Sequence, residues 1–343
     1  MPQPDPSLPD SRAAGAAPGA ADGTAADPVA AGPVAAGPVA ADPVPIDPVA
    51  VDWIAVDWGT SNLRAWAMDA GGRPLAEAAS AAGMGGLSAE GFEPALLALV
   101  APWLAAGRRT RVVACGMVGA RQGWIEAGYA AVPCPPSGPA ARAPTTDPRL
   151  EVLILPGLSQ ATPADVMRGE ETQIAGLIAA EPRFDGVACL PGTHTKWAHV
   201  SAGEVTSFAS FMTGELFALL STASVLRHSV GGAGWSAPDF AEAAAETLSR
   251  PERLAGRLFG LRAEALLADL APERARARLS GLLIGAELAA ARPYWLGRDV
   301  VLIGAPALTR AYAEALAMAG LTARVRDAGA MTLAGLAAAH ARL

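Results

Sequence analysis

One strand-and-turn pattern occurs twice in this chain, and that repeat restricts the fold more than any other feature. The first copy runs through WIAVDWGT, LRAWAMD, AGG and RPLAEAAS, and the second through GVACLPGT, HTKWAHV, SAG and EVTSFAS. Each copy predicts a buried strand, a Gly-Thr turn, a second strand, a turn of small residues and a third strand. Gly59 aligns with Gly192, and Thr60 with Thr193. The repeat predicts a duplicated α/β fold whose halves each begin with an antiparallel meander and face each other across a cleft.

The segments between and after the two copies alternate between strand and helix patterns. After the first copy we expect a helix over 92–106, a strand over 111–117, an exposed loop over 133–149, a strand in EVLILPGLS and a helix in RGEETQIAGLIAA. After the second copy we expect helices over 214–226, 238–257, 261–270 and 272–291, then the strand VVLIGAP, a helix to 319, the strand TARVRD and a helix to 340. The chain is long enough for two domains, which we place at 51–185 and 186–343.

Residues 1–50 differ from the rest in composition. They consist almost wholly of Ala, Pro, Gly, Asp and Val, with a loose repeat in AAGPVAAGPVAADPVPIDPVAVD. Such a segment has few large apolar side chains to offset the entropy lost on ordering. We predict a disordered, dispensable tail, with a docking role as the alternative.

The charge and hydropathy of the chain exclude several classes of protein. Its formal net charge is −7, whereas nucleic-acid binding needs a basic surface. The apolar run over 95–107 contains Pro102 and is too short to span a bilayer. The N-terminus reads MPQPDPSLPD, which is acidic where a signal peptide is basic. We expect a cytoplasmic protein with no nucleic-acid or membrane partner.

The cysteines and histidines do not form a metal or disulfide pattern. Cys115, Cys134 and Cys189 lack CxxC spacing, so we expect free thiols in a reducing compartment. His194 and His199 are five residues apart and would face opposite sides of one strand. These residues predict no zinc site.

The first hairpin has the composition of a phosphate-binding loop. It contains Asp57, Gly59, Thr60, Ser61, Asn62 and Arg64. Arg64 is two residues further along the strand from Asn62 and could reach the same cleft, where we predict that it contacts the substrate. Gly59 lets the backbone approach a phosphate, and the residues after it supply N–H and side-chain donors. The Asp57 carboxylate, at the strand end, could hold Mg²⁺ directly or through water. An ordinary hairpin turn is the alternative interpretation.

The second hairpin strengthens the phosphate-binding prediction. Gly192, Thr193 and His194 form its turn, followed by Thr195 and Lys196. The chain has 26 lysines and arginines, and Lys196 is the only lysine. Arginine does not replace lysine where a compact charge must reach a phosphate, so we predict that Lys196 stabilises charge during catalysis. A lysine retained by chance is the alternative.

A third element follows near the C-terminus. The strand over 300–304 ends in Gly304 and Ala305 and leads into a helix, an arrangement that suits an adenosine or phosphate contact. Together, the three elements predict that both halves hold one nucleotide.

Phosphoryl transfer from such a nucleotide to a hydroxyl would also need a carboxylate to orient or deprotonate that hydroxyl. The stretch from Asp165 to Gln173 is the best candidate because it begins a helix between the two phosphate hairpins. We rank Glu170 or Glu171 ahead of Asp165 as the base. Acidic residues are also good helix starters, which is the alternative.

Two further segments are candidates for the acceptor pocket. Arg121 and Gln122 follow a buried strand in a glycine-rich loop, and Arg121 could pair with a substrate carboxylate. Thr213 and Glu215 lie at a strand-to-helix junction, where a helix cap at Thr213 is the alternative.

Together these segments resemble the 2-dehydro-3-deoxygalactonokinase family. The motifs that carry the resemblance are DWGTSNLRAW, GMVGARQGW, the PGLS and RGEETQ stretch, LPGTHTKW, FMTGELFALLS and IGAPAL. It implies an actin-like ATPase fold of two ribonuclease-H-like domains, with ATP and Mg²⁺ in the cleft. It also implies phosphate transfer to the C6 hydroxyl of 2-dehydro-3-deoxy-D-galactonate in galactonate breakdown. Residues 57–61 resemble the superfamily's first phosphate motif, and 192–196 its second.

The chain departs from the superfamily pattern at two positions. Ala305 stands where a second glycine is common, and Leu190 stands at the position that matches Asp57. One alternative is a kinase of the same superfamily that acts on another small sugar or sugar acid. A second alternative is a polyphosphate or nucleotide phosphatase or sensor. The predicted partner is a small sugar acid, and a homo-oligomer is compatible with the sequence.

Overall fold

The computed structural model describes residues 46–343. The predicted disordered tail therefore lies mostly outside the described residues. Its last five residues are described: η1 (Pro48–Ala50) is a 3-10 helix, and Ile46 packs against the core of the first sheet.

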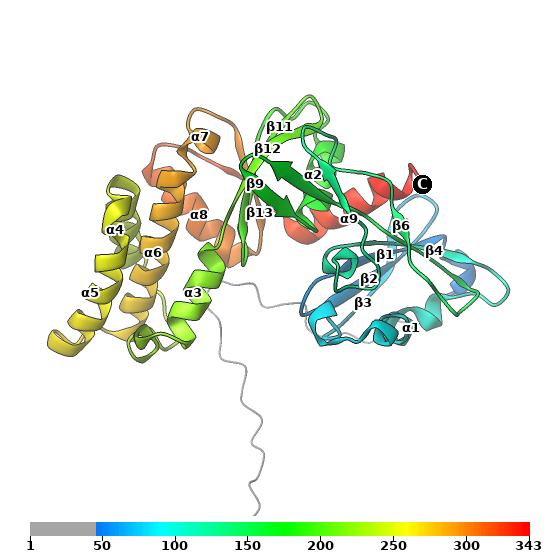
Figure 1. The fold of residues 1–343 in the computed structure, drawn as a ribbon, viewed down its shortest axis with the longest axis horizontal. Coiled ribbons are helices and arrows are strands. Elements are labelled where there is room, and N and C mark those ends of the chain that lie inside the picture. The colour runs from blue at the N-terminus through cyan, green and yellow to red at the C-terminus, as the bar shows by residue number, and fades with distance from the viewer. Residues whose placement is uncertain (1–45) are drawn as a thin grey trace, which may run out of the picture. The chain divides into compact units, whose positions relative to one another are not determined.

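Two mixed sheets repeat the same strand order (Figure 1). The first contains β1 (Trp53–Trp58), β2 (Leu63–Met68), β3 (Pro74–Ser80), β4 (Thr110–Cys115), β6 (Ala141–Arg142) and β7 (Leu150–Ile154) in the order β3-β2-β1-β4-β7-β6. The second contains β10 (Gly186–Leu190), β11 (Thr195–Ser201), β12 (Glu204–Phe211), β13 (Val300–Gly304) and β14 (Arg324–Asp327) in the order β12-β11-β10-β13-β14. In the first sheet β1 pairs antiparallel with β2 and parallel with β4. In the second sheet β10 pairs antiparallel with β11 and parallel with β13. Both predicted meanders and the predicted α/β class are confirmed.

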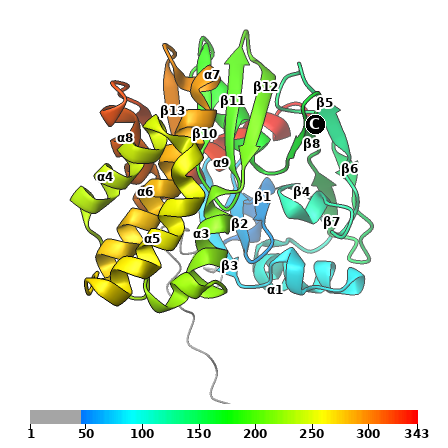
Figure 2. The same ribbon diagram turned by 60° about the vertical axis from the view of Figure 1, so that its left-hand side comes forward.

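A smaller sheet and the helices complete the described part of the chain. The small sheet consists of β5 (Tyr129–Ala131), β8 (Gly157–Ala161) and β9 (Ala164–Met167). The helices are α1 (Phe92–Val100), α2 (Glu170–Ala180), α3 (Thr213–Thr222), α4 (Ala237–Ser249), α5 (Leu254–Leu267), α6 (Pro272–Ala290), α7 (Arg292–Trp295), α8 (Pro306–Met318) and α9 (Ala328–His340). Helices α4, α5 and α6 lie side by side (Figures 1 and 2). None of the helices over 46–343 is long and apolar enough to cross a membrane.

Several expected helices end earlier than predicted. The helix over 92–106 ends at Val100, that over 214–226 ends at Thr222, and that over 238–257 ends at Ser249. The apolar pattern predicted a continuous helix over 238–257, but α4 ends at Ser249 and α5 begins at Leu254. Pro251 lies between them, where it cannot donate a backbone hydrogen bond and disfavours helical geometry at the residue before it. Arg250 accordingly has φ −139° and ψ 69°. The expected helix over 261–270 is the second half of α5.

Alternate side chains of each sheet contribute to separate cores. On the second sheet, Val187, Trp197 and Leu302 pack with α4, α6 and α8, while Ala188 and Val301 pack with α2. This division follows from the period-2 alternation of a strand. The central strands are buried on both faces and read as continuous apolar runs.

Helices α2 and α9 connect the two sheets. Helix α9 comes last in the chain, yet Leu336 and Ala339 pack on β1 and β4 of the first sheet. Helix α2 packs instead on the second sheet through Ile174 and Leu177. Where the two helices meet, a Cβ added at Gly335 would lie 1.9 Å from the carbonyl oxygen of Thr172. Their backbones are therefore in direct contact, which only glycine permits.

This contact predicts the effect of adding one methyl group. Gly335→Ala should lower the free energy of unfolding by about 1–3 kcal/mol, because the helices must separate to admit the Cβ. Gly256→Ala on α5 is the matched control, since its Cβ would meet no atom within 4 Å. It should stabilise the protein by about 0.5–1 kcal/mol. Urea unfolding measures both, and equal effects would contradict the proposed backbone contact.

Candidate active site

A backbone hydrogen bond closes the turn between β1 and β2, and the side chains at its tip are exposed to solvent. The Gly59 N–H donates to the Asn62 carbonyl at 2.9 Å. Thr60 and Ser61 are exposed, and Gly59 and Asn62 are half-buried. The hydroxyls of this loop are therefore available to a ligand.

A glycine-rich segment over 83–86, which the sequence analysis did not single out, supports this loop from behind. The Gly85 N–H donates to the Thr60 carbonyl at 2.9 Å. A Cβ at Gly83 would lie 2.2 Å from the carbonyl carbon of Ser61. The sequence MGG at 84–86 was the one feature that could have pointed to this segment, but glycine pairs occur in many turns and do not by themselves indicate a phosphate site.

Asp57 lies at the end of β1 beside a cation and a thiol. Arg64 Nη2 is 3.4 Å from its Oδ2, and Cys115 Sγ is 4.0 Å from its Oδ1. Burial raises the pKa of Asp57 above its ordinary value, and the Arg64 guanidinium opposes that rise. Roughly a third of the Asp57 side chain (32%) remains exposed. A ligand can therefore reach this carboxylate.

Glu170 and Glu171 form the first turn of α2. They follow Gly169, whose φ of +106° favours glycine. The Gly169 N–H donates to Glu171 Oε2 at 2.7 Å, and the Arg168 N–H donates to Glu170 Oε2 at 3.0 Å. Glu171 is only 2% exposed, whereas 26% of the Glu170 side chain is accessible. Glu170 is thus the carboxylate that a substrate can reach.

Both glutamates are shifted toward the protonated form. Burial raises the pKa of Glu170, and the positive charge of Lys196 opposes that rise. Burial, with a smaller contribution from the neighbouring Glu170 charge, raises the pKa of Glu171 to about 8. Glu171 therefore carries a proton through much of the neutral range.

Lys196 brings the second hairpin to these carboxylates. It lies on β11 with 5% of its surface exposed, and its Nζ is 3.8 Å from Glu170 Oε1. Cys115 lies near carboxylates of both the first hairpin and α2. Burial is the main cause that raises the pKa of its thiol, and the charges of Asp57 and Glu171 raise that pKa further. The structure thus gathers residues from β1, β11 and the start of α2.

The turn of the second hairpin contacts the start of α3. The Glu215 N–H donates to the Thr193 carbonyl at 2.9 Å, and His194 Nε2 is 2.5 Å from Glu215 Oε2. A Cβ at Gly214 would lie 2.2 Å from the Gly192 carbonyl oxygen. The structure brings Glu215, a candidate for the acceptor side, to the second phosphate hairpin.

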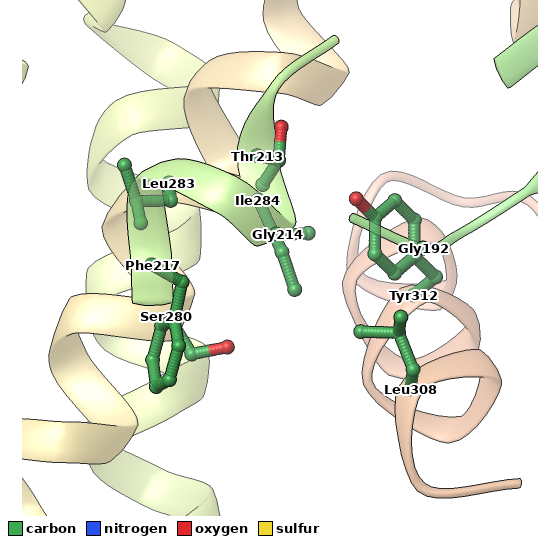
Figure 3. A pocket seen from close by; sticks show the side chains of 9 residues that line it. All are labelled: Gly192, Thr213, Gly214, Phe217, Ser280, Leu283, Ile284, Leu308 and Tyr312. Atoms are coloured by element: carbon green, nitrogen blue, oxygen red, sulfur yellow. The ribbon is translucent and has the colours of Figure 1, made fainter. Parts of the chain in front are cut away.

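A small pocket adjoins this turn (Figure 3). Nine residues line it: Gly192, Thr213, Gly214, Phe217, Ser280, Leu283, Ile284, Leu308 and Tyr312. It is apolar with a few hydroxyls, which is typical of sites for small organic groups. Gly304 and Ala305 precede α8, which supplies Leu308 and Tyr312. A Cβ at Gly304 would lie 3.1 Å from the Pro191 carbonyl oxygen.

Three candidate residues have other surroundings. Asp165 accepts hydrogen bonds from the Ser210 N–H and hydroxyl, both at 2.7 Å, and so joins β9 to β12. Arg121 is 81% exposed, with its Nε 3.6 Å from Glu126 Oε1. Gln122 beside it is also exposed. No contact between these three residues and Glu170 is seen in the described part of the chain.

The acidic residues fit a loosely held Mg²⁺ and do not fit a metal enclosed by protein. Residues 46–343 contain no group of three or more His, Cys, Asp or Glu placed to hold a metal. Mg²⁺ usually keeps several waters and binds one or two carboxylates together with substrate phosphates. The accessible carboxylate of Asp57, next to the first phosphate hairpin, meets that requirement.

The buried Glu171 predicts how stability depends on pH. Its folded pKa lies above its ordinary value, so the folded state holds the extra proton, and stability falls as pH rises toward about 8. Glu171→Gln removes this titration. From pH 5.5 to 8.5, wild type should lose at least about 1 kcal/mol relative to the variant.

Urea unfolding at both pH values checks this dependence. Glu90→Gln, at an exposed glutamate, is the control and should track wild type. A difference between wild type and Glu171→Gln that does not change with pH would contradict the shift.

Comparison with known proteins identifies the family of the chain. Residues 57–339 match the family model described as 2-keto-3-deoxy-galactonokinase. A "Probable 2-dehydro-3-deoxygalactonokinase DgoK1" from Rhizobium meliloti (strain 1021) is 40% identical over 288 residues, 82% of this chain and 94% of the relative. The 2-dehydro-3-deoxygalactonokinase of Escherichia coli (strain K12) is 36% identical over 270 residues, 76% of this chain and 88% of the relative.

A solved structure extends the match to three dimensions. The crystal structure of a "putative 2-dehydro-3-deoxygalactonokinase protein" from Sinorhizobium meliloti aligns with a TM-score of 0.77 and 39% identity. The alignment covers 84% of this chain and 99% of that one. The chain belongs to the 2-dehydro-3-deoxygalactonokinase family, whose members are ATP-dependent sugar-acid kinases.

Proposed function

We propose that this chain transfers the γ-phosphoryl group of ATP to the terminal (C6) hydroxyl of 2-dehydro-3-deoxy-D-galactonate, a step in galactonate breakdown. The proposal rests mainly on the contact between Lys196 Nζ and Glu170 Oε1, which are 3.8 Å apart beside the first phosphate hairpin. A cation and a carboxylate at this distance can serve the donor phosphate and the acceptor hydroxyl of one reaction. The family of the chain supplies the identity of the sugar acid.

In this proposal the nucleotide spans both hairpins. The base and ribose occupy the pocket beside Gly192 and Tyr312, with the turn at Gly304 and Ala305 at its edge. The phosphates then lie against the donors of 59–62 and 192–194. Lys196 stabilises the charge on the transferred group, because catalysis of phosphoryl transfer consists mainly of positioning and electrostatic stabilisation.

Glu170 is the proposed base. It accepts the proton of the C6 hydroxyl as that oxygen bonds to the γ-phosphorus and the bond from the phosphorus to the β–γ bridging oxygen breaks, releasing ADP. We prefer Glu170 to Glu171 as the base, because Glu170 combines exposure with a direct contact to Lys196. Glu171 then supports the turn from behind through its bond to the Gly169 N–H.

Mg²⁺ is the proposed metal, held by Asp57 directly or through water. When bound, it would neutralise charge on the phosphate oxygens. Arg64, 3.4 Å from Asp57, opposes the rise in the Asp57 pKa that burial causes and so favours the ionised carboxylate.

The acceptor pocket is the remaining part of the proposal. Arg121 and Gln122 are exposed on a loop after β4, and Arg121 is the proposed partner of the substrate carboxylate. Glu215 contributes through the second hairpin, because its N–H donates to the Thr193 carbonyl. Thr213, predicted from the sequence for the acceptor side, lines the pocket proposed here for the nucleotide. We place the reaction in the cytoplasm, and we retain domains of 51–185 and 186–343 as predicted.

A product assay tests the proposed substrate. ATP–Mg²⁺ is offered with 2-dehydro-3-deoxygalactonate, its gluconate epimer, galactonate or a neutral sugar, and products are identified by mass spectrometry. We expect phosphorylated 2-dehydro-3-deoxygalactonate to form fastest. Turnover only with another acceptor would replace the substrate and keep the kinase, whereas ADP release without a phosphorylated acceptor would favour a phosphatase or sensor.

Two substitutions test the residue roles. Lys196→Ala and Asp57→Asn should each lower kcat by about 10²–10³, because each removes charge that acts on the phosphates. Asp69→Asn, at the far end of the same β1–β2–β3 meander, is the matched control and should keep wild-type kcat. Circular dichroism should show all three folded. Unfolding of both site variants would make Asp57 and Lys196 structural residues instead.

A further inference from the structure

A buried glutamate outside the proposed catalytic set joins three elements of the nucleotide site. Glu287 on α6 is 4% exposed. Its Oε1 accepts the indole N–H of Trp197 at 2.8 Å, and its Oε2 accepts the Tyr312 hydroxyl at 2.7 Å and the Thr213 hydroxyl. The donors come from β11, α8 and α3.

Two of these donors form one end of the pocket. The Thr213 and Tyr312 hydroxyls point to the same end in Figure 3, and both bond to the same carboxylate oxygen. The pocket walls on α3 and α8 are thus held at a fixed separation by one side chain of α6. A carboxylate has enough acceptor sites for all these donors.

The same network fixes the strand that carries Lys196. Trp197 bonds to Glu287, and the Thr195 hydroxyl lies 2.9 Å from the Tyr312 hydroxyl, so both neighbours of Lys196 belong to the network. Successive side chains on a strand point to opposite faces. The network therefore holds β11 from one face while Lys196 points from the other toward Glu170.

We propose that Glu287 is a positioning residue for the nucleotide, which sets both the pocket walls and the place of Lys196 without contacting ATP. The proposal rests on the proposed function in that the pocket is taken to hold a nucleotide. Burial of a carboxylate is unfavourable unless donors surround it, and burial raises the pKa of Glu287 to about 7. The three donors oppose that rise, and a buried carboxylate with this many partners links elements that would otherwise separate.

The test is ATP–Mg²⁺ binding by calorimetry, together with steady-state kinetics. Glu287→Gln keeps the shape and replaces one acceptor oxygen by a donor, so it should weaken ATP binding about tenfold or more. The KM for the sugar acid at saturating ATP should change less than twofold. Tyr312→Phe removes one donor and should weaken ATP binding about threefold. Because both changes act on one network, the effect of the double variant should be smaller than the product of the two.

Thr247→Val on α4 is the matched control. The Thr247 hydroxyl is fully buried and donates to the Leu282 carbonyl of α6 at 2.7 Å, away from the pocket. It should lose stability in urea and keep wild-type ATP binding. Equal weakening of ATP binding by Thr247→Val and Glu287→Gln would overturn the proposal.

ATP binding by the wild-type protein distinguishes failure of the proposed function from failure of the role proposed for Glu287. If wild type binds no ATP, the proposed function fails, and this inference fails with it. If wild type binds ATP and folded Glu287→Gln binds it equally well, only the inference fails. Should Glu287→Gln not fold, Tyr312→Phe decides, and unchanged ATP binding in that variant would overturn the proposal.

Discussion

The proposed active site depends on one buried cation and the carboxylate it faces. Lys196 is almost wholly enclosed, and a charge removed from water needs a partner of opposite sign. Glu170 supplies it, 3.8 Å away, at the start of a helix whose sequence precedes the second sheet. This pair requires the second hairpin and the first turn of α2 to meet. It therefore fixes where the two phosphate hairpins lie relative to the proposed base.

The contact between α2 and α9 makes that meeting compatible with a duplicated fold. Each sheet is packed partly by a helix from the other half of the sequence, since α9 covers the first sheet and α2 the second. Glycines at the contact let the helix backbones touch. Two equivalent hairpins can then act on one ligand.

The local features of the fold could be predicted from the sequence. The repeated Gly-Thr turns and period-2 patterns predicted both meanders, because strand pairing in a hairpin depends on neighbouring residues. Helix ends were less secure, and Pro251 interrupted a helix whose apolar pattern continued past it.

Long-range partners could not be predicted. Asp165 bonds to Ser210, Glu215 to His194, and Glu287 to Trp197, and no local pattern encodes any of these pairs. Glu287 lies in an otherwise ordinary helix, so its burial among hydroxyls depends wholly on tertiary packing. The family resemblance identified the chemistry of the chain, whereas the geometry separated Glu170 from Glu171.

We propose that both hairpins and Lys196 hold one nucleotide while Glu170 faces the acceptor. The decisive experiment is a crystal structure with a non-hydrolysable ATP analogue, Mg²⁺ and 2-dehydro-3-deoxygalactonate. We expect the triphosphate to contact 59–62, 192–194 and Lys196, and the C6 hydroxyl to lie within hydrogen-bond distance of Glu170. A triphosphate bound elsewhere, or an acceptor whose C6 hydroxyl faces away from Glu170, would contradict it.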